Sequence, residues 1–356
     1  MLCSQIRKCL LPVVHRGLCR GHVHLPRVYV DRPMAIGGVG GESGIIDLDQ
    51  DVSHYLANVM RMKEGSQFRA FNSTEGEFLL ELIRAPSSIR KHGLHHRPAQ
   101  RNGARSDKAF ASIVCKLRGI EEAQAENIPV ALYFAPVKKA KIKVMVATLT
   151  ELGAGMLVPI KTQRTQKENI VGFPMETLQS CILEAVEQSE RLTIPTLEPP
   201  IELLEVLHRW QLRYDNDEKA GVRVTSLLVC KERADQIGQK QNGNHCKPLL
   251  STFLENGLAT SISATLLRGK EPKEVDDDLT DIGADIGLIV GPEGGFTDEE
   301  WELFRQYPVV QMVSLGGNVL RAETASAAAM ASVSSALEHL RASCGREGGR
   351  RAQQRI

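Results

Sequence analysis

From residue 128 onward, short apolar runs alternate with longer segments in which apolar residues recur every three or four positions. The short runs predict buried strands, and the periodic segments predict helices. The expected strands cover 130–135, 156–159 and 222–229, and the expected helices cover 139–152, 175–191 and 201–209. Polar loops are expected at 213–220, 232–247 and 271–281. This alternation predicts an α/β fold with a parallel sheet and helices on both faces.

Two further strand–loop–helix units follow near the C-terminus. In the first, an apolar run over 286–290 meets the loop Gly291 to Gly295, and Thr297 with Glu300 has the spacing of a helix capping box. In the second, a strand over 309–315 leads through the loop 316–318 into an Ala-rich helix that starts at about Arg321. Glycines at the carboxyl end of a strand let a ligand approach the backbone. The two loops together predict one small-molecule site.

A lone glycine-rich loop is more often an ordinary turn, but two features favour a site here. The first loop combines a proline, a glutamate and two adjacent glycines, which is more than a turn requires. The second loop places Arg321, Glu323 and Thr324 at the start of a helix that is otherwise Ala and Ser. Charges in that position indicate a function.

The N-terminal part has a different pattern, with short strands at 27–31 and 45–48, a hairpin over 67–83 and a strand over 109–119. One short helix, 50–60, leads to Arg61 and Lys63 in a turn. The glycine-dense stretch 37–44 is not followed by a helix, so it does not fit a dinucleotide-binding loop. Short strands with one helix predict a small β-barrel, joined by the linker 120–127 to the α/β domain.

Three segments fall outside these elements. Residues 1–26 contain basic and apolar residues and no acid, which is typical of an organellar transit peptide. A disordered basic tail or an RNA-binding arm is the alternative. The low serine content of this segment favours the mitochondrion over the plastid. If the segment is not a targeting sequence, a cytoplasmic location follows. Residues 86–108 form a basic insertion whose three histidines lack metal-binding partners, and 341–356 predict a disordered basic tail.

Composition narrows the functional classes. The net charge is only +1, so any RNA-binding surface must be a local patch. Aromatic residues make up 4%, which argues against a base-stacking platform. The eight cysteines have no CxxC spacing, so we expect reduced thiols and neither a zinc site nor a disulfide framework. No apolar run is long enough to span a membrane.

The stretches VGPEGGFTDEE and SLGGNVLRAETA together resemble the signature of the bacterial 16S ribosomal RNA uridine-N3 methyltransferase family. That family belongs to the SPOUT class, whose C-terminal domain contains a trefoil knot. ALYFAPVKK, TELGAGMLVPI and EAVEQSER fall upstream in the family's order. The resemblance covers most of 27–340. It implies a PUA-like RNA-binding barrel over 27–119, with 86–108 as an insertion, and a SPOUT methyltransferase domain over 128–340.

The resemblance implies S-adenosylmethionine as cofactor, no metal, small-subunit ribosomal RNA as substrate and a homodimer that forms the site at its interface. The cofactor-binding candidates lie in the two loops and the helix start that follows: Val290, Gly291, Pro292, Gly294, Gly295, Leu315, Gly316, Asn318, Leu320, Thr324 and Ala325. Uracil N3 is protonated at neutral pH, so methylation there needs a base or a group that stabilises the anion. Glu293, Arg321 and Glu323 are the candidates for this chemistry, although either glutamate could instead be structural.

Arg61, Lys63 and Arg164 are the candidates for RNA contacts, and a solvated turn is the alternative for the first two. Where the family tends to place a lysine shortly before its ELG sequence, this chain has Thr148, so Lys141 or Lys143 would have to make that contact. Methylation of another base or of a ribose 2′-OH therefore stays open, as does an RNA-binding assembly protein with a decayed site. A nicotinamide oxidoreductase is disfavoured because the phosphate-binding loop is missing.

Overall fold

The computed structural model describes residues 25–34, 44–84, 109–119, 130–219, 226–231, 246–255, 284 and 286–353. Residues 1–24 of the segment expected to be a transit peptide (1–26) lie outside this part of the chain. So do the insertion 86–108, the linker 120–127, most of the expected loop 232–247 and all of the expected loop 271–281. The chain divides into two compact units, Met1–Ala123 and Gln124–Ile356. Each unit is described by itself.

The first unit is built on a five-stranded sheet in the order β1-β3-β4-β5-β2. The strands are β1 (Arg27–Tyr29), β2 (Ile45–Asp47), β3 (Gln67–Asn72), β4 (Gly76–Arg84) and β5 (Phe110–Gly119). The predicted hairpin is confirmed as β3–β4, with Asn72 opposite Gly76. Phe68, Leu80 and Leu56 belong to the buried core that this sheet shares with the short helix beside it.

That short helix changes from α-helical to π-helical geometry along its length. Helix α1 (Gln50–His54) continues directly into a π-helical turn, η4 (Tyr55–Val59). The backbone then reaches Arg61, whose φ of 54° lies in the left-handed region that non-glycine residues rarely occupy. Non-glycine residues in that region often mark functional positions.

A buried ionic cluster crosses the same sheet. Glu77 is 1% exposed, and its carboxylate accepts from Arg27 Nε at 2.7 Å and from Arg118 Nε at 2.6 Å. Arg69 Nη1 lies 3.5 Å from the same carboxylate, and Arg27 stacks on the ring of Phe71. The five residues come from four strands, so this cluster depends on the sheet register.

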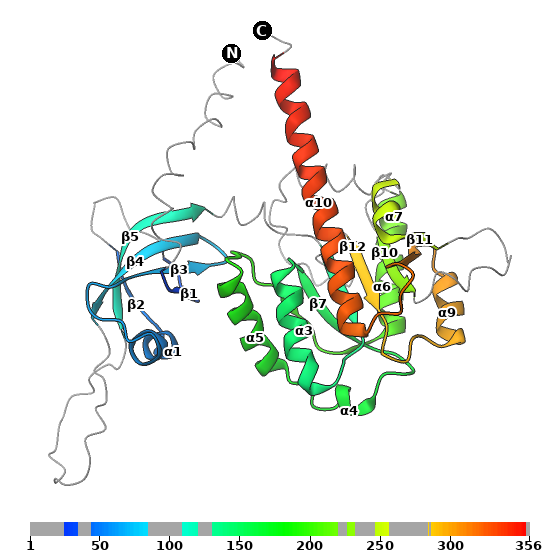
Figure 1. The fold of residues 1–356 in the computed structure, drawn as a ribbon, viewed down its shortest axis with the longest axis horizontal. Coiled ribbons are helices and arrows are strands. Elements are labelled where there is room, and N and C mark those ends of the chain that lie inside the picture. The colour runs from blue at the N-terminus through cyan, green and yellow to red at the C-terminus, as the bar shows by residue number, and fades with distance from the viewer. Residues whose placement is uncertain are drawn as a thin grey trace. The chain divides into compact units, whose positions relative to one another are not determined.

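The second unit contains an eight-stranded sheet in the order β11-β13-β10-β12-β6-β7-β8, with β9 beside β7 (Figure 1). All described pairings in it are parallel, as predicted. The strands are β6 (Val130–Phe134), β7 (Met156–Lys161), β8 (Thr196–Leu197), β9 (Ile201–Glu202), β10 (Ser226–Lys231), β11 (Lys247–Pro248), β12 (Ile286–Val290) and β13 (Val310–Ser314). Its central strands are almost continuously apolar because both faces are covered.

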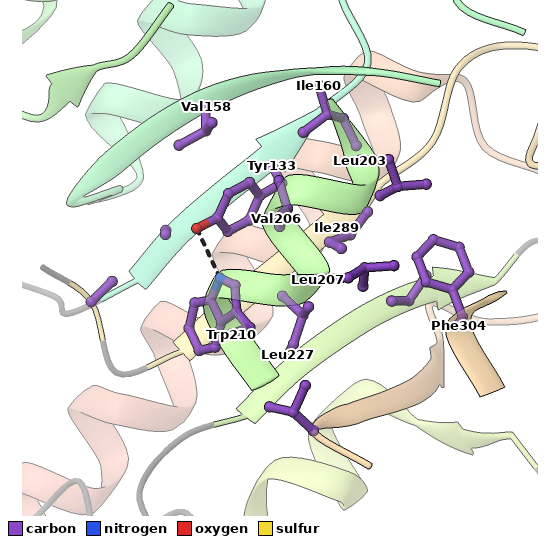
Figure 2. Close-up of a cluster of buried hydrophobic side chains, with 14 of the residues drawn as sticks. Tyr133, Val158, Ile160, Leu203, Val206, Leu207, Trp210, Leu227, Ile289 and Phe304 are labelled. Atoms are coloured by element: carbon purple, nitrogen blue, oxygen red, sulfur yellow. Dashed lines mark hydrogen bonds between the residues drawn. The ribbon is translucent and has the colours of Figure 1, made fainter. Parts of the chain in front are cut away.

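Helices cover both faces of this sheet. They are α3 (Lys139–Glu151), α4 (Lys167–Ile170), α5 (Met175–Gln188), α6 (Leu203–Lys219), α7 (Leu249–Glu255), α9 (Asp298–Arg305) and α10 (Ala322–Gln353). Figure 2 shows α6 lying across the strands, where Trp210 Nε1 donates to the Tyr133 hydroxyl at 2.8 Å. Helices α3, α5 and α10 pack together, and α10 contacts β6 and β12. None of the described helices is both long and apolar enough to cross a membrane.

Three predictions about secondary structure were wrong. Residues 213–219 belong to α6, whose apolar side continues one turn beyond Trp210 to Tyr214, which packs against the core, before the helix ends in polar residues. Lys247 starts the short strand β11 rather than ending a loop. Residues 341–353 continue α10 rather than forming a tail without regular structure, because extending an existing helix requires no new nucleation.

Candidate active site

A pocket lies at the carboxyl ends of β10, β12 and β13, which are neighbours in the sheet. Ligand sites in open α/β sheets occupy this position. The residues predicted from the two loops that line it are Val290, Gly291, Leu315, Gly316, Asn318, Leu320 and Ala325. The structure therefore brings the two sequence-distant loops together around one cavity.

Some predicted residues lie beside the cavity rather than in its lining. Pro292 is buried within the first loop, whereas Gly294 and Thr324 are exposed and Gly295 is half-buried. Three lining residues were missed, namely Cys230, Lys231 and Ala322. The first two end β10, and only the strand order, which places β10 between β12 and β13, brings them to the pocket.

The first loop has a tightly defined backbone. A side chain at Gly291 would place its Cβ only 2.8 Å from the Phe296 ring, so this position requires glycine. Gly295 has a φ of 68° and donates to the carbonyl oxygen of Pro292 at 2.9 Å. The predicted capping box is confirmed, because Thr297 accepts from the Glu300 amide and Glu300 accepts from the Thr297 amide.

The loop between β7 and α4 holds the first glycine loop, Gly291 to Gly295, in place. Arg164 Nη1 donates to the Gly294 carbonyl oxygen at 2.7 Å, and the Gln163 amide donates to Glu300 Oε1 at 2.8 Å. Arg164 thus supports the pocket loop as well as being exposed at the surface. Its predicted contact with RNA stays a prediction.

The two carboxylate candidates lie beside Lys141, which belongs to the first turn of α3. Lys141 Nζ lies 2.7 Å from Glu323 Oε1 and 3.8 Å from Glu293 Oε1. The hydrogen bond from Lys141, together with the backbone amide at the start of α10, lowers the pKa of Glu323 below its ordinary value, and Arg321 adds to this effect. Glu323 is therefore ionised at neutral pH.

Two polar groups next to the lining residue Ala322 have unused hydrogen-bonding capacity among the described residues. The second carboxylate oxygen of Glu323, Oε2, is buried and has no hydrogen-bond partner. Glu323 lies between Ala322 and Ala325, both of which line the pocket. The Arg321 side chain is exposed and makes no hydrogen bond or ion pair with the described residues. A buried acceptor and a free guanidinium side by side provide hydrogen-bonding capacity for a ligand.

The remaining site predictions concern RNA and metal. Arg61 and Lys63 are both exposed in the first unit, where the Lys63 amide donates to Ser66 Oγ at 3.1 Å. Within the described ranges, no group of three or more metal-ligating side chains forms, and Cys115, Cys181, Cys230 and Cys246 are not part of a disulfide. The histidines of the insertion lie outside those ranges.

Comparison with known proteins decides the family. An RNA methyltransferase domain model matches residues 124–250 and 249–334, and an RNA methyltransferase PUA domain model matches residues 48–89. The chain belongs to this RNA methyltransferase family. The pocket of the methyltransferase thus lies within the matched domain, and the PUA-like domain corresponds to the first unit.

Curated relatives and solved structures agree with this assignment. Ribosomal RNA small subunit methyltransferase E of Rickettsia conorii is 28% identical over 314 residues, covering 86% of this chain and 94% of the relative. The protein of the same name from Synechocystis is 26% identical and covers 80% of this chain and 71% of the relative. The Neisseria gonorrhoeae enzyme of that name, bound to S-adenosyl methionine, has a TM-score of 0.54 at 18% identity, over 88% of this chain and 98% of that chain. A Legionella pneumophila structure with bound SAM has a TM-score of 0.53 at 21% identity, with the same coverage. The fold is that of the SPOUT methyltransferases, as the sequence predicted.

Proposed function

We propose that this methyltransferase transfers a methyl group from S-adenosylmethionine to N3 of uridine in small-subunit ribosomal RNA. The observation that carries the proposal is the position of Arg321 and Glu323 on either side of Ala322, which lines the pocket formed by the two glycine loops. The relatives named as small-subunit RNA methyltransferases support the substrate class.

The pocket residues fit the cofactor. Val290, Leu315 and Leu320 provide apolar walls for the adenine, and Asn318 with the loop backbone provides hydrogen-bonding groups for the ribose. The cofactor has no pyrophosphate, so the missing phosphate-binding fingerprint is consistent with it. When bound, the cofactor would supply the electrophilic methyl group.

Arg321, Glu323 and Glu293 have the chemistry that methylation at uracil N3 requires. The N3–H proton must leave as the new N3–carbon bond forms and the methyl–sulfur bond breaks. Arg321 can donate to a uracil oxygen and stabilise the charge that develops there. The depressed pKa of Glu323 makes it a weak base, so its unpartnered oxygen is better suited to accept a hydrogen bond from the ligand. Glu293, whose side chain is 43% exposed, is the carboxylate better placed to exchange a proton with solvent.

Three further proposals follow from the resemblance. The two glycine loops, after β12 and after β13, would lie in and beside the trefoil knot. The enzyme would act as a homodimer, which fits the 54% exposed Val319 beside the pocket and the 68% exposed Val144 on α3. Sedimentation velocity tests the dimer.

Residues 1–26 would direct the enzyme to the mitochondrion. A fluorescent fusion to this segment tests this location, and a plastid or cytoplasmic signal would contradict it.

Nucleoside mass spectrometry tests the reaction. Protein-free ribosomal RNA and isolated small subunits would be incubated with the enzyme and methyl-labelled cofactor, then digested. Labelled N3-methyluridine is the expected product. Label in another base or on a ribose would overturn the target atom, and the absence of label with the cofactor still bound would favour an RNA-binding assembly protein.

A further inference from the structure

Lys231 places a positive charge in the wall of the pocket. It is the last residue of β10, it pairs in register with Ser314 of β13, and it lies at the end of the strand between the two glycine loops. Its side chain is half-buried, and its ammonium lies 5.4 Å from the centre of the Trp301 ring. The indole face holds the ammonium in a defined position.

This charge has no counter-ion among the described residues. Lys231 lines the pocket with apolar residues, glycines and one asparagine, and it forms no ion pair with the carboxylates that the structure describes. The two nearest thiols do not neutralise it. Burial raises the pKa of Cys230 to about 12, and burial also raises the pKa of Cys246 although Lys231 acts in the opposite direction. Both thiols are therefore uncharged at neutral pH.

A half-buried cation without a partner is stabilised by an anionic ligand group. We infer that Lys231 binds the carboxylate of the amino-acid part of the cofactor. This inference rests on the proposed function, because S-adenosylmethionine carries one negative group, and that group is its carboxylate. The apolar walls of the two loops would then hold the adenosine end, and Lys231 would fix the opposite end of the same molecule.

The test compares two ligands that differ in this group. S-adenosylhomocysteine contains the amino-acid carboxylate, whereas 5′-methylthioadenosine keeps the adenosine and the thioether and lacks the amino acid. Isothermal titration calorimetry would measure both ligands on the full-length protein and on Lys231→Met, which keeps the apolar stem and removes the charge. Lys231→Arg restores the charge, and Lys219→Met, an exposed lysine at the end of α6, is the matched control.

We expect Lys231→Met to bind S-adenosylhomocysteine about 10- to 100-fold more weakly, the usual effect of losing one charge-assisted hydrogen bond. Its affinity for 5′-methylthioadenosine should not change, and Lys231→Arg should recover most of the loss. Equal losses for both ligands would mean that Lys231 only shapes the pocket. Unchanged binding of both would assign the lysine to another anion, such as an RNA phosphate, and would overturn the inference. If the unaltered protein bound neither ligand, the cofactor assignment itself would fail.

Discussion

Arg164 Nη1 donates a hydrogen bond to the carbonyl oxygen of Gly294 at 2.7 Å and so joins the loop after β7 to the loop after β12. The same loop pair is joined a second time by the Gln163 amide and Glu300 Oε1. The first pocket loop therefore has two external supports in addition to its internal turn.

Removing the first support should loosen the pocket without unfolding the domain. Arg164→Ala is expected to weaken binding of S-adenosylhomocysteine by about tenfold, since a hydrogen bond to a charged group typically contributes 1.5–3 kcal/mol. Calorimetry measures the affinity, and thermal unfolding serves as the control. Arg305→Ala, which removes an exposed arginine of α9 that pairs with Glu302 of the same helix, is the matched variant and should bind normally. Normal binding by Arg164→Ala would show that the loop does not need this contact.

The pair of Lys141 and Glu323 should make stability depend on pH. The folded-state pKa of Glu323 is lowered, so its contribution is present above the ordinary value of 4.5 and is lost as the pH falls through the depressed pKa. Glu323→Gln should therefore be less stable than the unaltered protein by about 1 kcal/mol or less at pH 7, because the pair is partly exposed. The difference should shrink at acid pH. Urea unfolding at several pH values measures it, and a difference that grows on acidification would contradict the assignment.

The buried glutamate of the first unit should be essential to that unit. Glu77→Gln removes the negative charge that faces three arginines. It should lower the free energy of unfolding by about 3–5 kcal/mol, because a buried ion pair that loses one partner leaves an uncompensated charge. Glu81→Gln, on the same strand but only half-buried, is the control and should cost far less. Chemical unfolding followed by circular dichroism compares the two variants. Equal stabilities would mean that the arginines do not need Glu77.

A glycine in β12 should be irreplaceable for packing reasons. A Cβ at Gly287 would lie 2.5 Å from Leu227 Cδ1 and 2.7 Å from Trp210 Cζ2, so Gly287→Ala overpacks the core under α6. The expected cost is about 1–3 kcal/mol, measured by urea unfolding. At Gly317 an added Cβ meets nothing within 4 Å, so Gly317→Ala should leave stability nearly unchanged. A neutral Gly287→Ala would show that Trp210 and Leu227 can move aside.

Local patterns predicted the parts of the structure that local chemistry determines. The strand–loop–helix units, the β3–β4 hairpin and the capping box at Thr297 all depend on residues within a few positions of one another. The place of Lys231 in the pocket wall and that of Glu77 in the buried ionic cluster could not be predicted in this way. Each depends on which strands become neighbours in a sheet. The length of α6 was underestimated because its last residues, Asp215 to Lys219, are all polar and give no apolar periodicity, although Tyr214 still packs against the core.

The most direct test of the account is the turnover of Arg321→Ala, measured with the affinity of the same variant for S-adenosylhomocysteine. Arg321 is exposed and is absent from the pocket lining, so we expect normal folding and nearly normal cofactor affinity. Methyl transfer to small-subunit RNA should fall by about 10²–10³-fold, the usual loss when a group that stabilises a developing negative charge is removed. Full activity in Arg321→Ala would contradict the account and remove this residue from the mechanism.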